Sequence, residues 1–437
     1  MNEKTYHFLF LGVLTTIMIT MIGCTSKPKQ LYLIKENGKY GFIDSLGRKV
    51  IETSYLSAAP FSDGLALVVT DTTRVKGMRT KIDYHYIDET GKTIGKKNYT
   101  AYVSVIWSIL LNMDLEWHSG MNHLSTYSYS EGKALFQVVT NPEKDDEEIK
   151  YGYINKKGKV VIPCEYYNGD LFHEGKTMVQ DKPMDENGIK NPSSWKVIDE
   201  NGKSLTDYMF FSNARYYNDR CVATVITKDE RETEQRVVYV LLDENANVIR
   251  TYPDGWAKRL EEDYIIEEAG LASVFLGSKF YEARDGSEVT QSYDMSPAWI
   301  KNVSKNHGFA GPLGKEVKIS YVKGYSEGLF VCTTGKKDSE NWFFSDAHGF
   351  LYGNVAKERF VFEDALPFSS GRAAVKIDGK WGYINHDFEF VIPCQYDLAK
   401  PFDGNLAYVE SGYANFKIRS YIDRYGKPVW QDSQLDN

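Results

Sequence analysis

A motif that recurs along the chain limits its possible folds more than any other feature. Three copies, which begin at Lys39, Lys150 and Lys380, read Lys, aromatic, Gly, aromatic, Ile and then Asp or Asn. A Tyr, a Phe and a Val follow the Gly of each copy at shared offsets: Tyr55, Tyr166 and Tyr396, then Phe61, Phe172 and Phe402, then Val68, Val179 and Val409. Agreement over so many positions indicates a chain assembled from copies of one supersecondary unit.

The Asp or Asn that ends this motif is typical of a β-hairpin. A Gly follows three residues later, as in Asp44 with Gly47. We expect the side chain to accept hydrogen bonds from the backbone ahead of it, and the Gly to take the left-handed conformation that closes the turn. Further copies are Asp88 with Gly91, Asn155 with Gly158, Asp199 with Gly202, Asp346 with Gly349, Asp423 with Gly426, Asp243 with Ala246, Asn385 with Phe388, and a weaker one around Tyr281 to Gly286. We therefore interpret the repeated glycines as turn residues.

A second signature, an aromatic residue followed by two mostly polar residues and a Gly, precedes a further strand. Its copies span 61–64, 129–132, 172–175, 325–328 and 368–371. Successive turn residues Asn155, Asp199 and Asp243 lie 44 residues apart, the length of a propeller blade. The 31 Tyr and 22 Phe also favour strands. We predict an all-β fold of tandem β-hairpin units, three to four strands each, as a propeller-like ring or an open superhelical array, with the ring favoured.

Two segments resemble the bacterial WG repeat family. They are 379–385 with 391–393, which contains Trp381-Gly382, and 368–375. The resemblance extends over most of residues 31–430, although Tyr40 and Tyr151 replace the Trp in two strong copies. It implies an all-β repeat architecture and no particular reaction.

The N-terminal region predicts export and lipid anchoring. Residues 8–22 form an uncharged apolar run with the length of a signal peptide's hydrophobic region. The run ends in Met21-Ile22-Gly23-Cys24, which resembles the bacterial lipobox. That resemblance implies diacylglyceryl attachment to the Cys24 sulfur and cleavage before it, with an uncleaved anchor as the alternative. We expect a signal peptide at 1–23, a tether at 24–30, a repeat array of about eight or nine units at 31–430 and a tail at 431–437.

Both alternatives place the rest of the chain outside the cytoplasm. Two or three acyl chains give stable membrane attachment. The tether has no acidic run after Cys24, a feature that some bacteria use to send lipoproteins to the cell surface. We therefore expect an outer-membrane anchor in the cell envelope, with a periplasm-facing protein favoured over a surface-exposed one.

Two irregular regions interrupt the repeats, at 101–128 and at 253–320. The first includes 107–113, a candidate short helix. Insertions in repeat arrays tend to emerge as loops on one face and to carry binding. Decayed repeats are an equally good interpretation, because neighbouring units can still cover the core.

The sequence contains no recognisable catalytic, metal or cofactor motif. His118 and His123 lack the spacing of a metal site, and one Asp or Asn per hairpin does not converge on a calcium ion. A net charge of −8 without a basic stripe argues against a nucleic-acid partner. Cys164 and Cys394 occupy equivalent repeat positions. We therefore favour buried thiols over disulfides for these two, Cys221 and Cys332.

These observations favour a non-catalytic, membrane-anchored scaffold that presents its β-repeat surface to a protein or an envelope polymer. The first alternative is a carbohydrate-binding module, which exposed rings at Trp107, Trp117, Trp256 or Trp299 would support. The second is an envelope hydrolase whose site lies in an insertion, such as 101–128. We predict no catalytic residue, and Cys24 is the one modification site.

Overall fold

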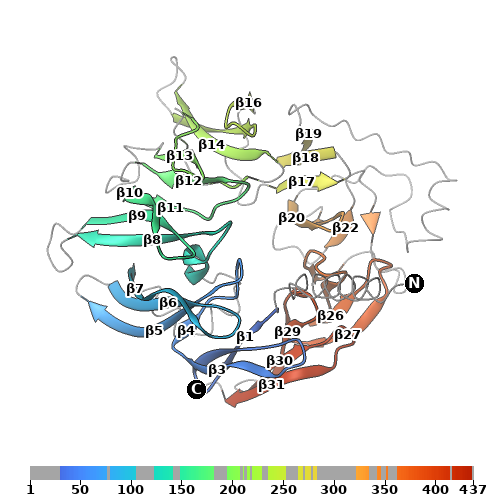
Figure 1. Ribbon diagram of the computed structural model, residues 1–437. Coiled ribbons are helices and arrows are strands. Elements are labelled where there is room, and N and C mark those ends of the chain that lie inside the picture. The colour runs from blue at the N-terminus through green and yellow to red at the C-terminus, as the bar shows by residue number, and fades with distance from the viewer. Residues whose placement is uncertain are drawn as a thin grey trace, which may run out of the picture.

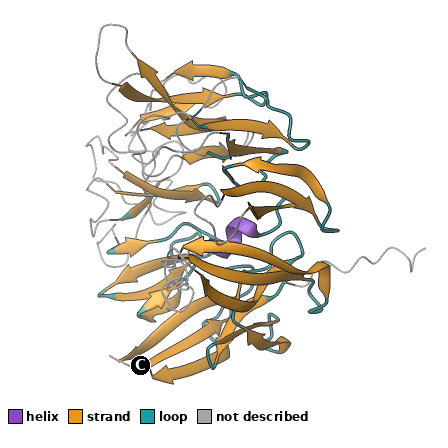
Figure 2. Ribbon diagram, turned by 90° about the vertical axis from the view of Figure 1, so that its left-hand side faces the viewer, coloured by secondary structure: helices purple, strands orange, loops and turns teal. Residues whose placement is uncertain are grey.

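The computed structural model describes the chain in segments. These are residues 30–75, 79–104, 123–140, 148–181, 194–206, 210, 214–216, 219–228, 235–251, 264–268, 271–276, 279–282, 321–333, 342–345, 351–352, 362–413 and 416–435. Strands dominate them, and the helical element that they contain is the short 3-10 helix η1, His123–Tyr127 (Figure 2). No described helix has the length and hydrophobicity needed to cross a bilayer.

The described strands form nine antiparallel sheets, each made of consecutive strands. The first four are β1 (Tyr32–Glu36), β2 (Lys39–Ile43) and β3 (Lys49–Tyr55); β4 (Ser57–Ala58), β5 (Ala66–Val75), β6 (Arg79–Ile87) and β7 (Thr93–Ser104); β8 (Lys133–Thr140), β9 (Glu148–Asn155) and β10 (Val160–Tyr166); and β11 (Asn168–Gly169), β12 (Lys176–Gln180) and β13 (Trp195–Asp199). The fifth and sixth are β14 (Cys221–Lys228), β15 (Gln235–Leu242) and β16 (Val248–Thr251); and β17 (Tyr264–Glu268), β18 (Leu271–Leu276) and β19 (Lys279–Glu282).

The last three sheets have four strands each. They are β20 (Tyr321–Ser326), β21 (Leu329–Thr333), β22 (Phe343–Ser345) and β23 (Leu351–Tyr352); β24 (Asp364–Ala365), β25 (Ala373–Ile377), β26 (Lys380–Ile384) and β27 (Phe390–Tyr396); and β28 (Leu398–Ala399), β29 (Ala407–Tyr413), β30 (Phe416–Ile422) and β31 (Pro428–Leu435). The prediction of an all-β fold with three to four strands per unit is confirmed.

The sheets follow one another around a ring in chain order, and the first lies beside the ninth (Figure 1). Side chains join these two sheets: the Tyr421 hydroxyl donates to the Leu33 carbonyl at 2.9 Å, and the Trp430 indole N–H donates to Glu36 at 3.1 Å. An open superhelix would keep the two ends of the array apart. The arrangement is therefore propeller-like, and we call the contact between the first and ninth sheets the seam.

The hydrophobic core lies between neighbouring sheets. One cluster packs Phe42 and Ile51 of the first sheet against Val68 of the second. Another packs Tyr383 of the eighth sheet against Val409 of the ninth. Alternation along a strand gives each blade two such apolar faces, so burying them requires a neighbour on both sides.

The predicted turn chemistry is confirmed. The Asp44 carboxylate accepts backbone N–H groups of Leu46 and Arg48 at 2.9 and 3.0 Å, and Gly47 has φ +75°. The same pair of side-chain bonds is made by Asp88, Asn155, Asp199, Asp243, Asn385 and Asp423. Asp346 lies outside the described residues.

Three repeat glycines correct the expectation that the glycines are turn residues. Gly41, Gly152 and Gly382 lie inside β2, β9 and β26. A Cβ at Gly152 would stand 2.5 Å from the carbonyl oxygen of Ile162 on the bulged neighbouring strand. These glycines provide space for a crossing backbone, which is a packing requirement rather than a turn conformation.

Candidate functional site

A tight turn, which we call the inner turn, leads into β5, β8, β12, β21, β25 and β29. The inner turns coincide with the second sequence signature, as at Ser62 to Leu65, where Asp63 and Gly64 both have positive φ. Positive φ at both central positions defines a type I′ turn, for which Asn, Asp and Gly are favoured. Glu131, Glu174 and Glu327 take the first central position in other sheets at positive φ, so something outside the turn must offset their strain.

Contacts with the next sheet supply that offset. Glu131 accepts hydrogen bonds from the backbone N–H groups of Glu174 and Gly175 at 2.6 and 2.8 Å, and Glu174 accepts one from Asp219 at 2.8 Å. The same kind of bond links Asp63 to Gly132, Glu327 to Gly371 and the Ser370 hydroxyl to Gly404. The inner turns therefore hold successive blades together.

The aromatic residue of the signature packs on the preceding sheet. Phe402 stacks edge-on against Tyr383 with ring centroids 4.9 Å apart, and Phe172 meets Tyr153 at 5.0 Å. The hydroxyls of these two tyrosines donate to the carbonyls of Lys400 and Asp170. Lys400 and Asp170 follow the innermost strands β28 and β11, so each tyrosine fastens the next innermost strand.

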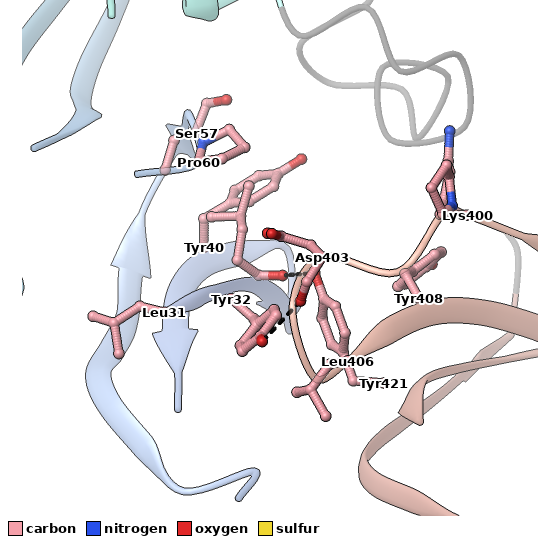
Figure 3. Close-up of a pocket in the computed structure, with 13 residues that line it drawn as sticks. Leu31, Tyr32, Tyr40, Ser57, Pro60, Lys400, Asp403, Leu406, Tyr408 and Tyr421 are labelled. Atoms are coloured by element: carbon pink, nitrogen blue, oxygen red, sulfur yellow. Dashed lines mark hydrogen bonds between the residues drawn. The ribbon is translucent and has the colours of Figure 1, made fainter. Parts of the chain in front are cut away.

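The first sheet lacks an innermost strand among the described residues. The eighth sheet is the reference, with strands in the order β24, β25, β26 and β27. By sequence, β2 of the first sheet corresponds to β26, so β1 corresponds to β25. No described strand of the first sheet corresponds to the innermost strand β24. A cavity of about 250 Å³ lies at the position where that strand would run. Its walls come from β1, from β4 on one side and from the segment after β28 on the other (Figure 3).

The cavity combines apolar walls with a few polar groups. The lining residues are Leu31, Tyr32, Leu33, Tyr40, Ser57, Ala58, Pro60, Lys400, Pro401, Asp403, Leu406, Tyr408 and Tyr421. Burial lowers the pKa of Lys400, with Glu410 opposing the shift, and burial raises the pKa of Asp403. Behind the wall, Tyr408 donates to the buried Glu410 at 2.7 Å.

Tyr32 takes over part of the role of the missing segment. It pairs with Ile43 across β1 and β2, as Ala373 pairs with Ile384. Its ring packs 5.5 Å from Tyr421, and its hydroxyl donates to the Asp403 carbonyl and accepts from the Asn405 N–H. The ring thus occupies the place that Phe402 takes beside Tyr383.

Sequence reasoning did not identify this cavity. A signal was available: Tyr32 stands where other repeats have Ala66, Ala134, Ala373 and Ala407, and no aromatic-x-x-Gly signature precedes Leu31. The importance of a missing signature becomes clear only when the ring places the first sheet beside the ninth.

Several candidate functional residues lie outside the described ranges, whereas His123 lies in η1. The residues outside include Cys24, His118, Trp107, Trp117, Trp256 and Trp299, together with most of 101–128 and 253–320. Cys164, Cys221, Cys332 and Cys394 are free thiols. No group of three or more possible metal ligands gathers within the described part of the chain.

A family model described as "WG containing repeat" matches residues 40–71, 151–182, 359–381 and 381–413. The chain contains WG repeats. The first matched segment includes the cavity residues Tyr40, Ser57, Ala58 and Pro60, and the last includes Lys400, Pro401, Asp403, Leu406 and Tyr408, whereas 31–33 and Tyr421 lie outside the matches. No curated protein matches the chain in sequence.

Solved structures align with much of the chain at low similarity. The β-propeller domain of the trilobed protease from Pyrococcus furiosus is 9% identical, with coverage of 87% of this chain and 95% of that one and a TM-score of 0.34. A quinonprotein alcohol dehydrogenase-like protein from Bacteroides thetaiotaomicron is 9% identical (94% and 93% covered, TM-score 0.30), and a Listeria monocytogenes protein is 11% identical (75% and 91%, TM-score 0.32).

Proposed function

We propose that this chain is a lipid-anchored binding protein of the bacterial cell envelope, which presents a WG-repeat ring to a protein or an envelope polymer without catalysing a reaction. The observation that supports this proposal most is that the recurrent polar side chains have structural roles in the ring. Asp44 and its equivalents cap their own turns, and Glu131 and its equivalents hold the next blade. The repeated residues thus build a ring, and its surface and seam cavity remain for recognition.

The tether length fits an anchored ring. Five residues, 25–29, lie between the candidate lipidation site Cys24 and Gln30, which are therefore joined by six Cα–Cα steps. Gln30 lies at the seam, where its amide donates to Asp403. A fully extended segment of this length reaches about 20 Å, so an acyl chain on Cys24 would keep the seam close to the bilayer.

The anchor is tested by Cys24→Ser in the native envelope. We expect the wild type to fractionate with membranes and to carry a diacylglyceryl mass on its N-terminal peptide, and the variant to lose both. Cys164→Ser is the matched control, because Cys164 is a half-buried thiol of the ring. Membrane retention of Cys24→Ser without lipid would contradict lipid anchoring and favour an uncleaved anchor.

The binding role is tested by crosslinking the tagged protein in intact envelope and identifying what is captured. We expect one reproducible partner, lost when 105–122 and 283–320 are replaced by short linkers. These replacements keep β7, η1 and the sixth sheet. Turnover of an envelope glycan or peptide by the purified protein would contradict the non-catalytic proposal.

A further inference from the structure

The innermost strands β11 and β28 share one bonding pattern. The residue after β28, Lys400, donates its N–H to the Tyr408 carbonyl at 2.9 Å and accepts the Tyr383 hydroxyl on its own carbonyl at 2.7 Å. Asp170, after β11, does the same with Met178 and Tyr153. The innermost strands β11 and β28 are therefore each held between a carbonyl of their own sheet and a tyrosine of the preceding sheet, whereas Phe42 stands at the tyrosine position before β4.

At the seam, the two groups that would hold such a strand bond to each other. In the first sheet, Leu33 is the residue after the one that pairs with Ile43. In the ninth sheet, Tyr408 is the residue after the one that pairs with Ile422. The Leu33 carbonyl therefore corresponds to the Tyr408 carbonyl, which accepts the N–H of the innermost strand. Tyr421 corresponds to Tyr383 in the preceding sheet. Its hydroxyl reaches the Leu33 carbonyl at 2.9 Å instead of an intervening strand.

The cavity is small, and the missing element is short. The innermost strands β4, β11, β24 and β28 are each two residues long. A cavity of about 250 Å³ is smaller than the roughly 300–1,000 Å³ of sites that enclose drug-sized ligands. It suits a short extended segment, and β1 has a strand partner on one side only.

We propose that the seam cavity binds an extended peptide segment of a partner protein, which adds to β1 as the fourth strand of the first blade. One peptide residue donates its N–H to the Leu33 carbonyl and accepts the Tyr421 hydroxyl on its carbonyl, which replaces one hydrogen bond by two. Strand addition of this kind obtains affinity from main-chain bonds and specificity from side-chain pockets. The inference rests on the proposed binding function and names its partner class.

The ring itself indicates which peptides fit. The residue that follows each short innermost strand donates its N–H to the second strand of the same sheet. The residue before this donor is always small: Ala58, Gly169, Ala365 and Ala399. A Cβ at Gly169 would already lie 2.6 Å from the Tyr153 hydroxyl. The bound segment therefore has Ala or Gly at this position.

The test titrates the purified full chain with a fluorescein-labelled peptide that copies residues 363–368, followed by polarisation. We expect saturable binding, weakened at least about tenfold when the peptide carries Ala365→Trp. Pro60→Trp in the protein should also weaken binding, because Pro60 is an exposed residue at the cavity wall. Leu46→Trp, at a residue 66% exposed and outside the cavity, should leave binding unchanged.

Hydrogen exchange provides the second readout. In the proposed complex the peptide residue that copies Leu366 donates its N–H to the Leu33 carbonyl, as Leu366 donates to the Ala374 carbonyl in the eighth sheet. Exchange at this peptide amide should therefore slow on binding. No saturable binding, or equal binding of the Ala365→Trp peptide, would overturn the proposal. So would a peptide Leu366 amide that exchanges as fast in the saturated complex as in the free peptide. An empty envelope capture would count against the proposed function alone, because the titration uses purified components.

Discussion

At the residue scale, one position of the repeat tolerates either a charged or a neutral side chain. Asp88 and Asn155 both accept two backbone N–H groups with one side-chain oxygen. Burial opposes ionisation of Asp88, but hydrogen bonds from Thr90 and Lys92 outweigh it and hold the pKa of Asp88 below 3.8. The turn therefore needs the acceptor geometry, and the charge adds a dependence on pH.

We expect Asp88→Ala to destabilise the ring by about 1 kcal/mol, because two backbone donors lose a partner. Asp88→Asn should retain most of that stability. The contribution of an Asp with a lowered pKa is present above the unfolded value of 3.8 and is lost as pH falls through the folded value. Urea unfolding at pH 7 and below pH 4 measures both effects.

The Asn variant serves as the internal control, since it does not titrate. Asp88→Asn should therefore show a smaller loss of stability in acid than the wild type. An identical loss in the two proteins would show that other carboxylates dominate acid unfolding.

Sequence patterns predicted these turn residues because their chemistry is local. Asp44 and Gly47 are three residues apart, so the repeat displays the whole interaction. The glycines inside strands were misinterpreted because the atom that excludes a side chain at Gly382 belongs to Ile392, on a neighbouring strand with a bulge. That bulge is not visible in the spacing of the motif.

At the scale of elements, the inner turns act as fasteners between blades. Glu131 holds a positive-φ conformation that suits Asn or Gly better, and its carboxylate reaches two N–H groups of the next turn. Basic side chains add to the same junctions: Lys156 lies 2.8 Å from Asp63, and His386 lies 2.9 Å from Glu327.

Glu131→Ala should lower the free energy of unfolding by about 1 kcal/mol, because exposed hydrogen bonds contribute modestly. It should also speed hydrogen exchange at the Gly175 amide, which loses its acceptor. Glu200→Ala, an exposed change on another turn, is the control. Unchanged exchange at Gly175 would show that the bond to Glu131 does not hold the junction.

The strands and hairpins followed from the sequence, whereas the junctions between blades did not. The Glu131 bonds span 43 and 44 residues, and the signature at 129–132 shows only an acidic residue before a Gly. The pairing becomes visible once the blades are known to stand side by side in chain order.

At the scale of the whole molecule, the ring closes by side-chain packing at the seam. Tyr32 makes the largest share of the seam contacts described above. Its ring packs against Tyr421, and its hydroxyl forms two hydrogen bonds to the backbone at Asp403 and Asn405. It is 3% exposed, so its removal leaves a cavity that the surrounding sheets cannot fill.

Tyr32→Ala should cost about 3 kcal/mol and make the first sheet the earliest site of proteolysis. Limited proteolysis with mass spectrometry measures the order of cleavage. Tyr425→Ala, at a ring 87% exposed, should leave both stability and cleavage unchanged. Cleavage that begins elsewhere in Tyr32→Ala would show that the seam is not the weakest closure.

The sequence predicted an array of β units and left closure open between a ring and a superhelix. The contacts that decide it join residues 371 to 394 positions apart. The candidate cavity depends on the same closure, so the repeat pattern alone could not locate it.

Seam closure also sets an order of events during synthesis. Every sheet is built from consecutive strands, so blades can form one after another with short loop-closure distances. The face of Tyr32 and Ile34 is different, because its cover, Tyr408 and Tyr421, is made last. A chain that emerges N-terminus first must carry an uncovered apolar face and an open strand edge until its final blade arrives, and that interval is when it is most exposed to aggregation and to chaperone capture.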